Sequence, residues 1–113
     1  MGVDLAVQRV GWNERLEVLL QLWDIAGQER QGTMFRAYFR DAQGAILVFD
    51  CTSEENLHRA KEWKEDIDSQ VTWNGNRIPV VLFANKWDLG AASAIDNKAQ
   101  MDAFCRENGF IAW

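Results

Sequence analysis

Two apolar runs in this sequence each break off into a short polar cluster, and this pattern constrains the fold more than any other feature. The first run, residues 20–25, carries Asp24 near its end and continues into Ala26-Gly27. The second run, residues 80–84, continues into Asn85-Lys86-Trp87-Asp88. In α/β proteins, ligands usually bind beyond the carboxyl ends of the sheet strands. The pattern therefore predicts an α/β domain whose binding site lies at one rim of the sheet.

The residues around Asp24 suit a phosphate group bound to Mg²⁺. Asp24 offers a carboxylate to a hydrated cation, and Gly27 has no side chain to keep an oxyanion away from its backbone N–H. Taken alone, the same stretch also fits a polar turn after a buried strand, because such turns are common. The second polar cluster favours the ligand-binding interpretation.

The order of the remaining segments predicts the α/β class with a central, mostly parallel sheet and flanking helices. Residues 3–10 alternate apolar and polar side chains, which predicts a half-buried strand. A turn at residues 11–14 then joins it to an antiparallel strand at residues 16–25. We expect three apolar residues of this second strand to be largely buried: Leu20, Leu22 and Ile25.

Further along, the apolar run at residues 44–50 predicts a buried parallel strand. We expect a short helix from Thr33 through Phe39, and a longer helix that Thr52 and Glu55 begin as a capping box. Asp96 is expected to cap the last helix, which ends at the Asn-Gly pair at residues 108–109. The apolar faces of the two longer helices are predicted to contain Leu57, Ala60, Trp63 and Ile67, and Ala99, Ala103 and Phe104, respectively.

At its two polar clusters the sequence resembles the Ras-like small GTPases, and the Rab branch in particular. Asp24-Ile25-Ala26-Gly27-Gln28-Glu29 is similar to the second-switch motif of that family, and Asn85-Lys86-Trp87-Asp88 to its guanine-specificity motif. Trp23 and Tyr38-Phe39-Arg40 resemble the Rab branch. The sequence at residues 2–4, 20–23 and 101–105 looks closest to the subgroup of Rab proteins that serves lysosome-related organelles.

This resemblance implies a P-loop NTPase-like small GTPase fold, with GTP or GDP and Mg²⁺ as cofactors. It implies a switch that binds and hydrolyses GTP and regulates intracellular vesicle trafficking. At the phosphate end, Asp24 would hold Mg²⁺ through water, the N–H of Gly27 would contact the γ-phosphate, and Gln28 would orient the attacking water as the catalytic residue.

At the base end, the resemblance implies that Asp88 accepts two hydrogen bonds from guanine. Asn85 and Lys86 would brace the base and its loop. Adenine would present an acceptor to the Asp88 carboxylate, which costs about 1.5–3 kcal/mol for each lost charge-assisted bond.

The resemblance also implies a surface for protein partners. Leu5, Trp23 and Tyr38 match the aromatic triad with which Rab proteins bind effectors, although Leu5 stands where the family usually has Phe. Gln31 also departs from the family pattern, which commonly has an aromatic residue there. The implied partners are Rab effectors, a nucleotide exchange factor and a GTPase-activating protein.

Several family motifs are missing from these 113 residues. There is no Gly-x-x-x-x-Gly-Lys-Ser/Thr sequence, no first-switch Thr and no Ser-Ala-Lys base loop. Residues 1–113 are therefore expected to form a partial small GTPase domain without the P-loop strand and helix and the C-terminal strand and helix. Losing roughly half a dozen phosphate contacts at ~1.5 kcal/mol each lowers affinity about a million-fold, so we expect no useful nucleotide binding by this chain alone.

A domain without the P-loop strand and the C-terminal strand has unpaired strand edges, which predicts a swapped or edge-paired oligomer. Two alternatives to the GTP switch follow. One is a truncated, nucleotide-independent module that binds Rab effectors through Leu5, Trp23 and Tyr38. The other is an α/β domain whose motifs no longer function.

Composition narrows the setting of the protein. The net charge of −5 argues against nucleic acid as a partner. Cys51 and Cys105 are isolated cysteines in a chain without a signal peptide, which predicts reduced thiols in the cytoplasm. The chain has no spanning apolar run and no terminal cysteine for a lipid, so we expect no direct membrane anchor in it. The complete protein would work on the cytosolic face of endomembranes.

Overall fold

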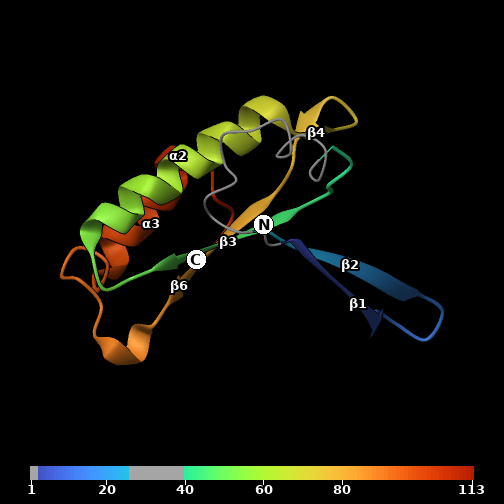
Figure 1. Ribbon diagram of the computed structural model, residues 1–113, viewed down its shortest axis with the longest axis horizontal. Helices are drawn as coiled ribbons and strands as arrows, with labels where there is room; N and C mark the ends of the chain where they lie inside the picture. The colour runs from blue at the N-terminus through green and yellow to red at the C-terminus, as the bar shows by residue number, and fades with distance from the viewer. Residues whose placement is uncertain (1–2, 26–39) are drawn as a thin grey trace. The chain divides into compact units, whose positions relative to one another are not determined.

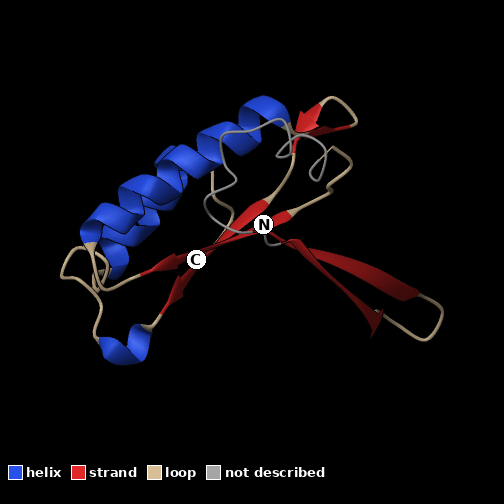
Figure 2. Cartoon of the chain, in the orientation of Figure 1, coloured by secondary structure: helices blue, strands red, loops and turns tan. Residues whose placement is uncertain are grey.

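The computed structural model describes residues 3–25 and 40–113, and its chain divides into two compact units, residues 1–38 and residues 39–113. Figures 1 and 2 show the elements of both units. The helix predicted from Thr33 through Phe39 lies outside the described residues.

The described part of the first unit is a β-hairpin. Strands β1 (Val3–Gly11) and β2 (Glu17–Ile25) pair antiparallel in a continuous register. The carboxamide oxygen of Asn13 closes the turn, since it accepts hydrogen bonds of 2.8 Å from the backbone N–H groups of both Arg15 and Leu16. Asn favours such turns because its short side chain reaches the backbone two and three residues on. The predicted strands, turn and pairing are therefore confirmed.

The predicted burial of this hairpin is wrong. Leu20 and Leu22 are 40% and 46% exposed, and only Ile25 is half-buried. Leu5 and Val7 are also exposed, although their strand was predicted to be half-buried. A two-stranded ribbon has two faces, and its side chains are buried only where a second layer packs on them. An apolar pattern identifies a strand, but it does not supply that layer.

The second unit is built on parallel strands. Strand β3 (Ala45–Asp50) pairs with β6 (Val80–Asn85), with Leu47 opposite Leu82. On the other side of β6, Ala112 forms a parallel bridge to Val81. The parallel strands and flanking helices confirm the predicted α/β class.

Two helices cover one face of these strands (Figure 1). Helix α2 (Glu54–Gln70) connects β3 to β6, and α3 (Lys98–Asn108) connects β6 to the segment at Ala112. Both connections step in the same direction across the sheet. Since parallel crossovers are right-handed, both helices fall on the same side.

This one-sided cover corrects the prediction of a buried strand at residues 44–50. Val80, Leu82 and Phe49 are buried on the helix-covered face, whereas Val48 and Phe83 are more than half exposed. Side chains alternate between the two faces of a strand, so a continuous apolar run is buried throughout only where both faces are covered.

The core of the second unit lies between the helices and the sheet. Ala60 and Ile67 of α2 are buried as predicted, but Ala99 of α3 is exposed. Helix α3 instead buries Met101 and Cys105. Both cysteines of the chain are free thiols. The other buried apolar residues are Cys51, Val71, Ile78, Ile95 and Phe110.

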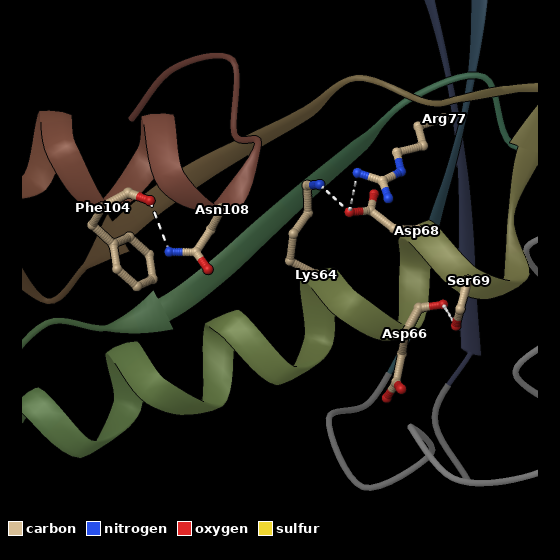
Figure 3. Close-up of polar contacts among 7 residues, drawn as sticks. All are labelled: Lys64, Asp66, Asp68, Ser69, Arg77, Phe104 and Asn108. Atoms are coloured by element: carbon tan, nitrogen blue, oxygen red, sulfur yellow. Dashed lines mark hydrogen bonds and ion pairs between the residues drawn. The ribbon is translucent and has the colours of Figure 1, made fainter.

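Within residues 3–25 and 40–113, one buried residue is charged. Lys64 of α2 is 3% exposed, and its ammonium group forms an ion pair of 2.5 Å with Asp68, one turn further along the helix. Arg77 approaches the same carboxylate oxygen at 3.7 Å (Figure 3). This cluster of Lys64, Asp68 and Arg77 was not predicted from the sequence.

The helix caps differ from the predicted ones. Ser53 rather than Thr52 precedes α2 in an extended conformation, and Glu55 pairs with Arg59 instead of closing a capping box. Thr52 is drawn away from the helix because its hydroxyl donates to Asp50. Helix α3 is capped by Asn97, whose side chain accepts a hydrogen bond from the N–H of Gln100, so the predicted cap at Asp96 is one residue early.

Smaller elements complete the second unit. Strands β4 (Thr72–Trp73) and β5 (Asn76–Arg77) form a tight hairpin, with Asn74 and Gly75 both at positive φ in its turn. A single 3-10 turn, η2 (Trp87–Leu89), follows β6. No helix within residues 3–25 and 40–113 combines the length and the apolar character needed to cross a membrane.

Candidate functional site

The predicted guanine-binding segment begins where β6 ends. Asn85 is the last residue of β6 and lies opposite Asp50, the last residue of β3. The two carboxyl ends therefore meet at one edge of the sheet. Lys86 then turns the chain with φ 65° and ψ 30°, the left-handed conformation that side-chain-bearing residues rarely adopt. This turn leads directly into η2, which carries Asp88 in an exposed position.

An ion pair joins the two strand ends. The ammonium group of Lys86 lies 3.1 Å from Oδ2 of Asp50 and donates a hydrogen bond to it. The other oxygen of Asp50 accepts two hydrogen bonds from Thr52, at 2.6 Å from the hydroxyl and 2.9 Å from the backbone N–H. These bonds, the hydroxyl of Thr52 first and then its N–H, together with Lys86, lower the pKa of Asp50 from 3.8 to about 2.

Backbone hydrogen bonds hold the same segment from a second direction. The N–H of Cys51 donates to the carbonyl oxygen of Asn85 at 3.0 Å, and the carbonyl oxygen of Cys51 accepts from the N–H of Ala92 at 2.9 Å. Within the segment, the N–H of Leu89 donates to the carbonyl oxygen of Lys86. The loop after β6 is therefore tied to the end of β3 both before and after η2.

An open apolar pocket of about 380 Å³ lies beside this segment. It extends from Asn85 and Trp87 to Trp113 and the exposed side chains of Val48 and Phe83. The indole N–H of Trp113 donates to Oδ1 of Asp102 at 2.8 Å, which fixes the ring against α3.

The ion pair and the backbone bonds hold three of the predicted residues, Asn85, Lys86 and Asp88, in one braced segment.

The predicted phosphate and metal residues lie in the other unit. Asp24 is exposed near the end of β2 and lies directly opposite Asp4 in the strand register. Like charges in this position repel each other, and a cation relieves that repulsion. Carboxylate oxygens are also the donors that Mg²⁺ prefers, so this pair fits the predicted metal. Gly27 and Gln28 lie outside the described residues.

Two of the three predicted effector residues form a cross-strand pair. Leu5 and Trp23 lie directly opposite each other, so both side chains are on the same face of the hairpin. They are 51% and 45% exposed. Tyr38 lies outside the described residues.

Asp50 is a site residue that was not predicted from the sequence. Asp50 ends an apolar run at the carboxyl end of a strand, which is the same signal that Asp24 and Asn85 carry. Lys64 carried no such signal, because a lysine within a helix is ordinarily a solvated residue.

Comparison with known proteins decides the family. The family model described as "Ras family" matches residues 1–113, the whole chain. The chain belongs to the Ras family. This match confirms the resemblance that the two motifs, residues 24–29 and 85–88, indicated in the sequence.

Relatives that the chain resembles along its whole length carry Rab names. The chain is 49% identical to Ras-related protein Rab-32A of Dictyostelium discoideum, with 100% of the chain and 52% of the relative covered. It is 46% identical to human Ras-related protein Rab-32 and 43% identical to human Ras-related protein Rab-7L1, covering 50% and 55% of them. The likeness to the Rab branch is thus confirmed, and the chain spans about half the length of the curated relatives that it matches.

Proposed function

We propose that this chain belongs to a Rab-type guanine-nucleotide switch that binds and hydrolyses GTP and regulates vesicle trafficking. The observation that carries the proposal is the braced segment from Asn85 to Asp88, in a chain that the Ras family model matches from end to end. The left-handed turn at Lys86 and the bonds from residues 50 and 51 hold the backbone of the segment that carries Asp88. Strained backbone of this kind persists where function requires it.

In this proposal each predicted residue has one task. The Asp88 carboxylate would accept hydrogen bonds from the ring N–H and the amino group of guanine, while Asn85 and Lys86 brace the loop. Asp24 would hold Mg²⁺ through water, with Asp4 adding to the negative charge beside it. The ion would neutralise charge on the phosphates. Gly27 would contact the γ-phosphate, and Gln28 would orient the attacking water.

The expected partners and location follow from the family. We propose that Rab effectors, an exchange factor and a GTPase-activating protein bind the complete protein on the cytosolic face of endomembranes. The similarity to Rab-32 and Rab-7L1 proteins favours the same subgroup of Rab proteins. Residues 1–113 are proposed to be one part of the small GTPase domain.

The first test is made on the protein isolated from its natural source. Its intact mass is measured, and the nucleotides released on denaturation are quantified by chromatography. We expect about one guanine nucleotide for each protein molecule and no adenine nucleotide. A protein of about 13 kDa that releases no nucleotide would contradict the switch.

The second test determines which base the segment binds. GDP and ADP are titrated into the labelled complete protein, because residues 1–113 alone are expected to bind no nucleotide, and the amide signals of residues 87–89 are followed by NMR. We expect these signals to shift with GDP and not with ADP. An Asp88→Asn variant offers guanine one acceptor and one donor in place of two acceptors, so its response to GDP should fall at least tenfold. An equal response to both nucleotides would contradict the assignment of Asp88.

A second function is favoured by the pair Leu5 and Trp23. This exposed cross-strand pair does not depend on a nucleotide for its position on the hairpin. We therefore keep a nucleotide-independent module that binds Rab effectors as the alternative proposal. It predicts effector binding that is unchanged by GDP, by GTP analogues and by removal of Mg²⁺.

A further inference from the structure

The end of strand β3 holds the guanine-binding segment in its strained conformation. Asp50 and the backbone of Cys51 contact that segment from one side. Neither residue belongs to the two motifs, residues 24–29 and 85–88, that resemble the family. The inference below rests on the proposed function for its guanine role, and on the structure alone for its mechanical part.

The strain lies at Lys86. Its backbone takes φ 65°, a conformation that glycine adopts freely and that lysine adopts only when its surroundings enforce it. A residue with a side chain takes this conformation at a cost in free energy, which contacts around it offset. The supports available to Lys86 are the bond from Leu89 N–H to its own carbonyl oxygen and the ion pair of its side chain with Asp50.

Asp50 is itself a fixed anchor. Its Oδ1 accepts both the hydroxyl and the N–H of Thr52, so the carboxylate cannot rotate without breaking two bonds. The carbonyl oxygen of Asp50 also accepts a hydrogen bond of 3.0 Å from the side chain of Asn56 in α2. Oδ2 is left pointing at Lys86, 3.1 Å away.

The neighbouring residue ties the two flanks of the segment. Cys51 is fully buried, and its two backbone bonds reach Asn85 before the turn and Ala92 after it. Asp50 therefore acts on Lys86, the first residue of a loop whose two flanks are tied to Cys51.

We propose that Asp50 is a positioning residue of the guanine site, which holds the strained turn at Lys86 and so sets the place of Asp88 before any nucleotide arrives. The arrangement accounts for the opposite charges of Asp50, at the end of β3, and Lys86, directly after the end of β6. It also separates the role of Lys86 into two parts, a backbone turn and a side-chain anchor.

Hydrogen exchange tests this proposal in the nucleotide-free 113-residue chain. The amides of Leu89 and Gly90 report on the segment, because both donate hydrogen bonds within it, and the amides of α3 report on the rest of the unit. We expect Asp50→Asn to speed exchange at Leu89 and Gly90 about threefold or more and to leave α3 unchanged. Asp41→Asn removes the same charge from an 84% exposed side chain and is the matched control, with no change expected.

A double-variant comparison separates the ion pair from general weakening. Asp50→Asn and Lys86→Met remove the two ends of one contact, so the double variant should exchange no faster than the faster single variant. Additive effects, equal acceleration in α3, or no acceleration beyond that of Asp41→Asn would each overturn the positioning role.

A GDP titration of the same variants, made in the complete protein, then tests the guanine part. We expect Asp50→Asn to weaken GDP binding about threefold or more and Asp41→Asn to leave it unchanged. If exchange responds as expected and the complete wild-type protein binds no GDP, the mechanical role of Asp50 stands and the proposed guanine-nucleotide switch fails. Equal GDP affinity in wild type and Asp50→Asn would overturn the link to the guanine site.

Discussion

The ammonium nitrogen of Lys64 lies 5.8 Å from the centre of the Phe110 ring, although Lys64 is in helix α2 and Phe110 follows helix α3. The same ammonium is paired with Asp68, whose other oxygen is buried and has no hydrogen-bond partner among the residues that the structure describes. Figure 3 shows Lys64 and Arg77 converging on this carboxylate. The lysine therefore links α2 to the turn that leads into the last strand segment.

Removing the Lys64 charge should destabilise the second unit. Lys64→Met leaves the largely buried Asp68 carboxylate, 14% exposed, with Arg77 alone at 3.7 Å, so we expect the free energy of unfolding to fall by about 2–3 kcal/mol. Urea denaturation followed by circular dichroism measures this loss. Lys61→Met, on an exposed position of the same helix, should change it by less than about 0.5 kcal/mol.

A second variant checks the reason for that loss. If the cost comes from the unpaired carboxylate, Asp68→Leu in the Lys64→Met background should recover part of the stability, because both charges are then absent. A double variant less stable than Lys64→Met would show that packing and not charge is responsible.

Gly109→Ala should destabilise the chain more than Gly75→Ala. Both glycines have positive φ, 76° and 79°, so each alanine has a backbone cost of about 1–2 kcal/mol. A Cβ at Gly109 would also meet Nζ of Lys64 at 3.1 Å, whereas one at Gly75 meets nothing within 4 Å. We expect an additional loss of about 0.5–1 kcal/mol at Gly109 in thermal or urea unfolding. Equal losses would mean that the Lys64 ammonium moves aside without cost.

The carboxylate of Asp50 should contribute to stability in a defined acid range. Its pKa is about 2 in the folded chain, below the ordinary 3.8, so the ionised form stabilises the fold above pH 3.8, and this contribution is lost as the pH falls towards 2. The carboxyl ¹³C chemical shift of Asp50, recorded against pH, measures this pKa directly.

Thr52→Val removes the hydroxyl bond, the largest cause of the lowered pKa. We expect the pKa of Asp50 to move towards 3.8, and the loss of stability on going from about pH 4 to about pH 2 to be smaller than in the wild type. Thr72→Val, in strand β4, is the matched control and should leave the pKa of Asp50 near 2. A pKa unchanged by Thr52→Val would contradict the role of the hydroxyl.

Trp23→Ala should weaken binding to a purified Rab effector domain by about thirtyfold or more, as expected for an aromatic residue at the centre of an interface. Surface plasmon resonance measures the affinity, and circular dichroism shows whether the hairpin is kept. Trp12→Ala is the control, since Trp12 is 72% exposed at the hairpin turn and is not part of the predicted triad. Equal weakening by the two variants would contradict an effector surface at Leu5 and Trp23.

The sequence predicted much of the local structure because the signals involved are local. The alternation at residues 3–10, the turn at 11–14 and the apolar runs before Asp50 and Asn85 act within a few residues of where they appear. The strands, their pairing partners in the hairpin and the loop position of the guanine motif follow from them. The family resemblance rested on motifs of the same local kind.

The sequence by itself thus determined the α/β class, the order of the longer strands and helices among the described residues, and the place of Asn85, Lys86 and Asp88 at a strand end. Only the tertiary structure decided which apolar residues are buried, since that depends on the layer opposite them, as at Leu22 and Val48. It also decided the caps, because Thr52 bonds to Asp50 instead of the helix. The contacts of Asp50 with Lys86 and of Lys64 with Phe110 join residues 36 and 46 positions apart, and such distances are closed by packing and leave no local pattern to read.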